Sequence, residues 1–190
     1  MTTLVDARSG IDEPGWADVS REEIGLVPTR VEVLACGAAD RGDDGASIAA
    51  LAGLDSEFPP DVTVRLVGQL DIDDLLAVPV GAGAVVVDTV TGVDPGWVVE
   101  IPFVGLAGRE LGIRARSAVA LARPETVGLA SMIRGRPLTG MIVGIGGLTF
   151  GSGEALSWPV ATGLCTFRLA IVDAIDRVRG DALASLIDHR

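Results

Sequence analysis

The apolar residues of this chain fall into short runs that polar turns separate. Five runs have the length and composition of β-strands: residues 31–35, 62–67, 84–87, 97–101 and 141–145. The runs at 84–87 and 141–145 are continuous and contain no polar side chain, which is the pattern of strands that are buried on both faces of a sheet. The runs therefore predict a sheet that other elements cover on both sides.

Helical patterns lie between these runs. Residues 46–54, 72–78 and 125–134 are predicted helices, and a longer helix follows Ser157, a candidate N-cap, with Pro159 in its first turn. Its apolar residues recur at spacings of three and four: Val160, Leu164, Phe167, Ile171, Ile175 and Val178. Alternating strands and helices with short connections predict an α/β fold of the hydrolase or phosphorylase kind. It is a three-layer sandwich with a mostly parallel, twisted sheet of about five strands and helices on both faces.

The first 29 residues differ from the rest of the chain. They mix Asp, Glu, Gly, Pro and Ser with scattered apolar positions, which predicts an N-terminal extension that is only partly ordered. Residues 30–190 are then expected to form a single α/β domain.

The net charge of the chain argues against some classes of binding partner. The chain has 190 residues and a formal net charge of −11, which argues against binding to nucleic acid or to an anionic membrane surface. The sequence shows neither an unbroken apolar run of membrane-spanning length nor the pattern of a signal peptide, so we expect a cytoplasmic protein. Cys36 and Cys165 lie in apolar surroundings without CxxC spacing and are predicted to be reduced and buried.

Two absences from the sequence exclude whole reaction classes. The chain contains no lysine. A Walker A phosphate loop and Schiff-base catalysis both require one, so both are excluded. Its single histidine, His189, is the penultimate residue, where a catalytic base for a serine or cysteine nucleophile is not expected. The glycines after the first strand do not match GxGxxG, which argues against a dinucleotide site.

Acidic residues follow two of the predicted strands. Asp43 and Asp44 come after the first strand, in 33-VLACGAADRGDDGAS-47, and Asp88 ends the third. Asp44 has two interpretations at this point: an N-cap of the next helix with Asp43 solvated beside it, or part of a site. A buried carboxylate such as Asp88 is costly unless it is protonated, paired or bound to a metal. Since parallel strands end at one edge, the acids predict an oxygen-rich site for a divalent cation.

A glycine-rich loop follows the last predicted strand. The stretch 144-GIGGLTFGSGEALS-157 has two interpretations: a flexible connection that leads into a helix, or a rim that lets a peptide backbone approach closely.

Four motifs in order resemble the hydrogenase maturation endopeptidases, which trim the large subunit of nickel-iron hydrogenases. The stretch 34-LACGAADRGDDGAS-47 is similar to the family's GxGNxxxxDDGxG opening, without its asparagine. The later motifs are 66-LVGQLDIDDLLA-77, 85-VVVDTVTGVDPGWV-98 and 143-VGIGGLTFGSGEALSWPVATGL-164. The resemblance covers roughly residues 31–178.

The resemblance implies an activity, a partner and a set of site residues. The chain would remove the C-terminal extension of a hydrogenase large subunit precursor after nickel insertion, with no tightly bound cofactor of its own. Asp44 and Asp88 match the ligands that grip the substrate's nickel, and other divalent cations are possible, while Asp43 would manage protons. The family's histidine has no match here, and its position falls near Ala120 or on Glu125, which could replace it.

Two other functions fit the same residues. A family member that has lost catalysis could bind a hydrogenase subunit as an assembly factor, and the missing histidine is its chief support. An unrelated enzyme or binding protein for a small molecule could use the same sheet, and a deep pocket at the strand ends would distinguish it.

Overall fold

The computed structural model describes residues 30–54, 57–106, 114–115 and 124–187. Their centre is a mixed sheet in which five strands run in the order β2-β1-β3-β6-β4 and a short strand, β5, pairs with β3. The bounds are β1 (Arg30–Cys36), β2 (Val62–Gly68), β3 (Ala82–Thr91), β4 (Val98–Pro102), β5 (Arg114–Ala115) and β6 (Gly140–Gly146). All five predicted strands are therefore present.

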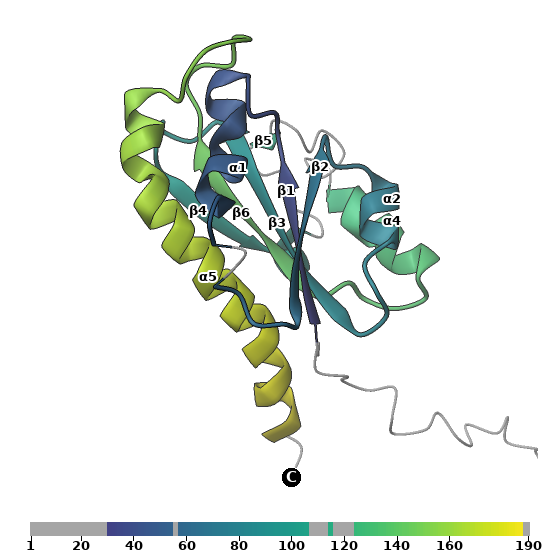
Figure 1. Ribbon diagram of the computed structural model, residues 1–190. Coiled ribbons are helices and arrows are strands. Elements are labelled where there is room, and N and C mark those ends of the chain that lie inside the picture. Colours follow the sequence, from purple (N-terminus) through teal and green to yellow (C-terminus); the bar gives the residue numbers. More distant parts are fainter. Residues whose placement is uncertain (1–29, 55–56, 107–113, 116–123, 188–190) are drawn as a thin grey trace, which may run out of the picture.

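Most strand pairs are parallel, as the alternation of strands and helices predicts. β1 pairs in parallel with β2 and β3, and β3 pairs in parallel with β6. The antiparallel pairs are β4 with β6 and β5 with β3. Figure 1 shows that β1, β3 and β6 point their carboxyl ends toward the same end of the molecule.

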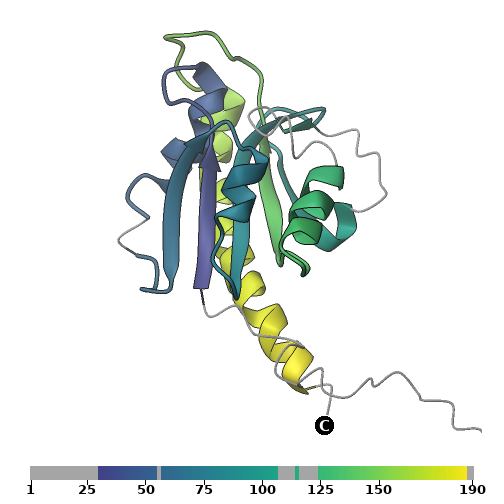
Figure 2. The ribbon, with the colours of Figure 1, turned by 90° about the vertical axis from the view of Figure 1, so that its right-hand side faces the viewer.

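Helices cover both faces of the sheet and complete the three layers. The helical elements are η1 (Gly42–Gly45), α1 (Ala46–Leu51), α2 (Ile72–Leu76), α3 (Phe103–Leu106), α4 (Pro124–Ile133) and α5 (Trp158–Ile187). Helices α1 and α5 lie on one face, and α2 and α4 lie on the other (Figures 1 and 2). The predicted three-layer α/β sandwich is confirmed.

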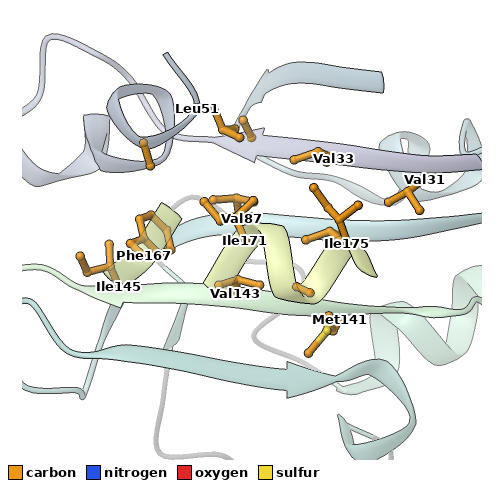
Figure 3. Packing of buried hydrophobic residues seen from close by; sticks show 14 of the residues in the cluster. Val31, Val33, Leu51, Val87, Met141, Val143, Ile145, Phe167, Ile171 and Ile175 are labelled. Atoms are coloured by element: carbon orange, nitrogen blue, oxygen red, sulfur yellow. The ribbon is translucent and has the colours of Figure 1, made fainter. Parts of the chain in front are cut away.

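Each face of the sheet has its own apolar core, because alternate residues of a buried strand point to opposite sides. On the α5 face, Phe167, Ile171 and Ile175 pack against the sheet residues Val87 and Val143 (Figure 3). The α2/α4 face buries a separate cluster of residues from β1, β3, β6 and the helices: Leu34, Cys36, Leu70, Leu75, Val78, Ala82, Ala84, Val86, Phe103, Val127, Ala130, Leu138 and Ile142.

The helices α2 and α4 are joined by an arginine at the end of α4. Asp71 and Asp74 form a capping box at the start of α2. At its other end, Arg134 Nη1 donates to the carbonyl oxygens of Leu75, Leu76 and Val78 at 3.2, 3.0 and 2.7 Å. Leu75 O also accepts from Val78 N at 3.4 Å. The guanidinium thus caps the end of α2 and fixes α4 beside it.

Helix α5 is long and largely apolar. Its segment Trp158–Gly180 has the length and composition that would suffice to cross a membrane, and 33% of that segment is buried in the fold. Val160, Phe167 and Ile171 are fully buried on the sheet. This burial accounts for the apolar side of the helix, and the expectation of no membrane partner stays a prediction.

The structure corrects several details of the sequence analysis. Strand β3 continues past Asp88 to Thr91, because it still pairs with β6 and with β5 there. The short elements η1, α3 and β5 were not predicted, since two to four residues carry no periodic signal. Cys36 is buried as predicted, but Cys165 is exposed on α5. The predicted extension, residues 1–29, and His189 lie outside the described residues.

Candidate functional site

The candidate site lies where β1 ends and β3 continues. The pairing of β1 with β3 ends at Ala35 and Val87, so Asp88 is the first β3 residue beyond it. The turn η1, which contains Asp43 and Asp44, follows β1 and meets β3 directly: Thr89 Oγ1 donates to the backbone oxygen of Asp43 at 2.6 Å. The two acidic segments predicted to converge are thus adjacent.

Asp43 is fully buried. Its carboxylate accepts from the backbone N–H groups of Leu148, Thr149 and Ser157 at 2.7, 3.0 and 2.6 Å. It also accepts from the Ser157 hydroxyl at 2.8 Å. Burial alone would raise the pKa of Asp43, but these donors outweigh it and hold the pKa below its ordinary value. Asp43 is therefore ionised at neutral pH.

These contacts make Asp43 the anchor of the glycine-rich loop and of the start of α5. Both carboxylate oxygens already have donors, and a strongly stabilised carboxylate is a weak base. The arrangement favours a positioning role. The predicted catalytic role of Asp43 stays a prediction.

Asp44 is 6% exposed and lies against the turn that follows β1. Its Oδ2 accepts from the backbone N–H of Ala38 at 3.1 Å. Gly37 allows this approach: its φ is +105°, and a Cβ there would lie 1.9 Å from the backbone oxygen of Asp44. The N-cap of α1 is Gly45, without a side-chain hydrogen bond. The N-cap interpretation of Asp44 is therefore wrong.

Asp88 is fully buried, and its Oδ1 accepts from the backbone N–H of Thr89 at 2.7 Å. Strand alternation places it on the face of Val86, which is also the face of Cys36. Burial raises the pKa of the Cys36 thiol well above its ordinary range, and the charges of Asp88, Asp74 and Asp44 raise it further. Asp88 directly precedes Thr89, which contacts the backbone of Asp43, the neighbour of Asp44, so Asp44 and Asp88 lie at the same edge of the sheet.

The predicted third ligand is not tested by the structure. Glu125 belongs to the first turn of α4, but its side chain lies outside the description, as does Ala120. Within the described ranges, no group of three His, Cys, Asp or Glu side chains is placed to hold a metal ion. The described chain contributes two carboxylates to the candidate site, Asp44 and Asp88.

Two further residues shape the site, and sequence reasoning missed the role of both. Thr89 joins β3 to η1 through its hydroxyl, and a polar pair, Asp88 and Thr89, within an otherwise apolar strand is the signal that could have revealed it. Ser157 was predicted as an N-cap, and its carbonyl oxygen accepts from Ala161 N at 2.9 Å, as at the start of a helix. Its hydroxyl serves Asp43 instead.

The chain resembles known proteins in its structure, although its sequence matches no family model. No family model and no curated protein matches the sequence. Among solved structures, the [NiFe] hydrogenase maturation protease HybD from Thermococcus kodakarensis is 24% identical, with a TM-score of 0.59 over 77% of this chain and 99% of that one. The hydrogenase maturating endopeptidase HybD from E. coli is 13% identical, with a TM-score of 0.62 over 78% and 93%. The maturation protease HycI from Thermococcus kodakarensis KOD1 is 17% identical, with a TM-score of 0.56 over 78% and 93%. The fold of this chain is that of the hydrogenase maturation proteases.

Proposed function

We propose that this chain is an endopeptidase that removes the C-terminal extension of a nickel-iron hydrogenase large subunit precursor after nickel insertion. One observation carries the proposal: Asp44 and Asp88, both nearly or fully buried, lie at the strand-end edge of the fold that the maturation proteases have. The expected cytoplasmic location is part of the same proposal.

The electrostatics of this edge suit a bound cation. Asp44 and Asp88 are nearly or fully buried at neighbouring strand ends, where two negative charges repel each other and water screens them poorly. A divalent cation relieves this repulsion, and carboxylate oxygens are hard ligands. In the proposed reaction the cation is the nickel that the precursor carries, so the protein needs no resident metal.

The reaction itself is hydrolysis of one peptide bond. Asp44 and Asp88 bind the nickel of the precursor and so hold the neighbouring scissile bond at this edge. Water adds to the scissile carbonyl carbon, the C–N bond breaks, and the departing amine takes a proton. If Glu125 contributes a third oxygen ligand, it replaces the histidine of the hydrogenase maturation endopeptidases that the sequence resembles.

The test is processing of a nickel-loaded precursor from the same organism, read as the mass of the large subunit. Asp44→Asn and Asp88→Asn remove charge but keep volume, and an amide is a poorer ligand than a carboxylate. Both variants should stay folded and leave the precursor at full length. Asp61→Asn is the matched control, because Asp61 pairs with Arg179 and precedes β2, away from the site. Full processing by the folded Asp44 and Asp88 variants would disprove the role of the acid pair.

A second candidate function is an assembly factor that binds the large subunit without cutting it. The observation in its favour is the absence of histidine from residues 117–133, the segment where the resembling family has one. Processing by the unmutated chain separates the two functions, and Glu125→Gln tests the third ligand. If Glu125 supplies the third ligand, this variant slows processing; an assembly factor binds the precursor but leaves its mass unchanged, with or without the substitution.

A further inference from the structure

Helix α5 carries apolar side chains on the side that faces away from the sheet. Trp158 is 79% exposed, Leu169 67% and Val172 38%, and Cys165 between them is also exposed. Helix α5 is an outer element of the fold, next to α1 (Figure 1). We call these four residues the outer stripe.

The outer stripe is one continuous face of the helix. Successive residues of an α-helix are turned by about 100°, so the four residues of the stripe lie within about 60° of one another, over about 21 Å of helix. The opposite side of α5 is buried in the apolar cluster of the sheet, through Val160, Phe167, Ala174 and Val178. Helix α5 is therefore apolar on two opposite sides, and a helix that is apolar all round is normally covered all round.

The chemistry of the outer stripe narrows what can cover it. Arg168 is the one charged residue in 158–172, and its Nη2 is turned toward α1, where it donates to Ala49 O at 2.9 Å. The stripe thus offers no charge that a basic or acidic partner could recognise. A lipid surface is disfavoured as well, because interfacial helices carry lysine and arginine on their polar face. Here the acids Asp173 and Asp176 follow the stripe, with side chains that are 65% and 69% exposed.

We propose that the outer stripe binds the outer stripe of a second copy of this chain, as an antiparallel pair of α5 helices with a two-fold axis at Cys165. The stripe is self-complementary in this arrangement. Trp158 opposes Val172 of the second copy, and Leu169 opposes the exposed Ala161 of the second copy. A larger side chain therefore meets a smaller one at each level of the contact. The dimer does not depend on the proposed function.

The distribution of charge permits this contact although each chain has a net charge of −11. Neither copy brings an acid into the contact within 158–172, and charges more than about 8 Å apart are largely screened at physiological salt. Asp173 of one copy lies level with Ser157 of the other, at the start of its α5, where the helix dipole favours a negative charge. The antiparallel arrangement thus places an exposed acid where it is tolerated best.

The two candidate sites lie at opposite ends of the proposed dimer. Ser157, at the start of α5, donates to the Asp43 carboxylate in η1, so each site adjoins the start of its own helix. The starts of antiparallel helices point in opposite directions, and the two sites are therefore separate. The contact is smaller than a standard interface, which buries about 800 Å² on each partner, so we expect a Kd on the order of 10 µM.

Sedimentation velocity of the full chain measures the dimer. Between about 1 and 200 µM the mass should rise from the 19.5 kDa of one chain toward twice that value. Leu169→Asp brings a negative charge into the contact from both copies and should raise the Kd by at least about 100-fold. Met132→Asp is the matched control, because Met132 is 79% exposed on α4, outside the stripe. Both side chains are exposed, so both variants should keep the melting temperature of the unmutated chain.

Cross-linking tests the position of the two-fold axis. The chain has two cysteines, and Cys36 is buried, so a short bismaleimide reacts with Cys165. An axis at Cys165 predicts covalent dimers at concentrations above the Kd. It also predicts none from Cys165→Ser, and few from Leu169→Asp at the same concentration.

Three results would overturn the proposal. A chain that stays at 19.5 kDa at about 200 µM does not form the dimer. A dimer that Leu169→Asp leaves intact uses another face, and one that Leu169→Asp dissociates but bismaleimide does not link has its axis elsewhere. A monomeric chain that cosediments with vesicles of uncharged phosphatidylcholine, and loses this binding in Leu169→Asp, identifies lipid as what covers the stripe.

Discussion

The two faces of the sheet differ in what they bury. On the α5 face, a 30-residue helix lies along the sheet, and its Phe167 is fully buried in an apolar cluster that α5 shares with the strands. On the other face, the helices α2, α3 and α4 have five, four and ten residues. Its strands place Cys36 and Asp88 among apolar neighbours.

This difference shows how the fold separates stability from chemistry. Dry, well-packed apolar surface stabilises a fold most when it is continuous, and α5 provides that surface. A buried carboxylate such as Asp88 costs free energy, so it needs a fold that is already stable. We therefore expect substitutions in the acid pair to leave the fold intact, and substitutions on the buried side of α5 to destabilise it.

The largest effect should come from the α5 face. Phe167→Ala should lower the free energy of unfolding by about 5 kcal/mol, and Phe103→Ala, which is also buried, by about 3 kcal/mol. Phe167 lies in the middle of a long helix, where the cavity cannot collapse, while Phe103 begins the four-residue helix α3. Urea titration of both variants measures the difference. An equal or larger loss for Phe103→Ala would contradict the contrast between the faces.

The next effect concerns chemistry rather than stability. Asp88→Asn should lower the rate of precursor processing by at least about 100-fold, because loss of a partner of a metal ligand alone costs about 10- to 100-fold. Its unfolding midpoint should stay the same or rise, since a buried negative charge is removed. Rates measured beside circular dichroism melts test both statements. A destabilised variant that still processes the precursor would assign Asp88 to stability instead.

Asp43 should give a smaller and pH-dependent effect. Asp43→Asn should lower the free energy of unfolding by about 2 kcal/mol at neutral pH, because hydrogen bonds to a charged group are lost. The pKa of Asp43 is lowered in the folded state from its ordinary value of 3.8, so the unfolded chain binds the proton more readily. The contribution is therefore complete above that value and is lost as the pH falls through the lower folded pKa. Denaturant titrations from pH 7 to pH 2 should show the variant and the unmutated protein converging at acid pH, with Asp40→Asn as the exposed control.

The smallest effect should come from removing residues 1–29. These residues offer few apolar anchors, so their deletion should change the free energy of unfolding by no more than about 0.5 kcal/mol. Thermal melts of the shortened chain test this expectation. A shortened chain that no longer unfolds cooperatively would show that one face of the sheet depends on the extension.

Much of the fold could be predicted from the sequence, because buried parallel strands leave a local signal. The apolar runs at 31–35 and 141–145 lie within β1 and β6 almost to the residue. The end of β3 could not be predicted in the same way. Asp88 and Thr89 interrupt the apolar run, and the partners that keep them in a strand, β5 and β6, come from distant parts of the chain.

The convergence of the acidic segments at one edge could be predicted from the sequence, but the contacts of these acids could not. Strand ends indicated Asp44 and Asp88, because parallel strands place their carboxyl ends at one edge. The sequence suggested that Asp43 is either solvated or manages protons, and it did not indicate that Asp43 anchors the glycine-rich loop. That role arises from Leu148, Thr149 and Ser157, and no local pattern connects these residues to Asp43.

The hydrogen bonds of Asp43 also determine when the site can form during synthesis. Asp43 and Ser157 are 114 residues apart, and during synthesis the N-terminal part of the chain emerges from the ribosome first. A nascent chain therefore holds both acids of the turn η1 long before it holds the donors that fix this turn. Contacts between residues so distant in sequence form late, after the loop between them has closed. In the proposed endopeptidase, the complete edge exists only once the final helix has emerged and docked, so unfinished chains cannot cut.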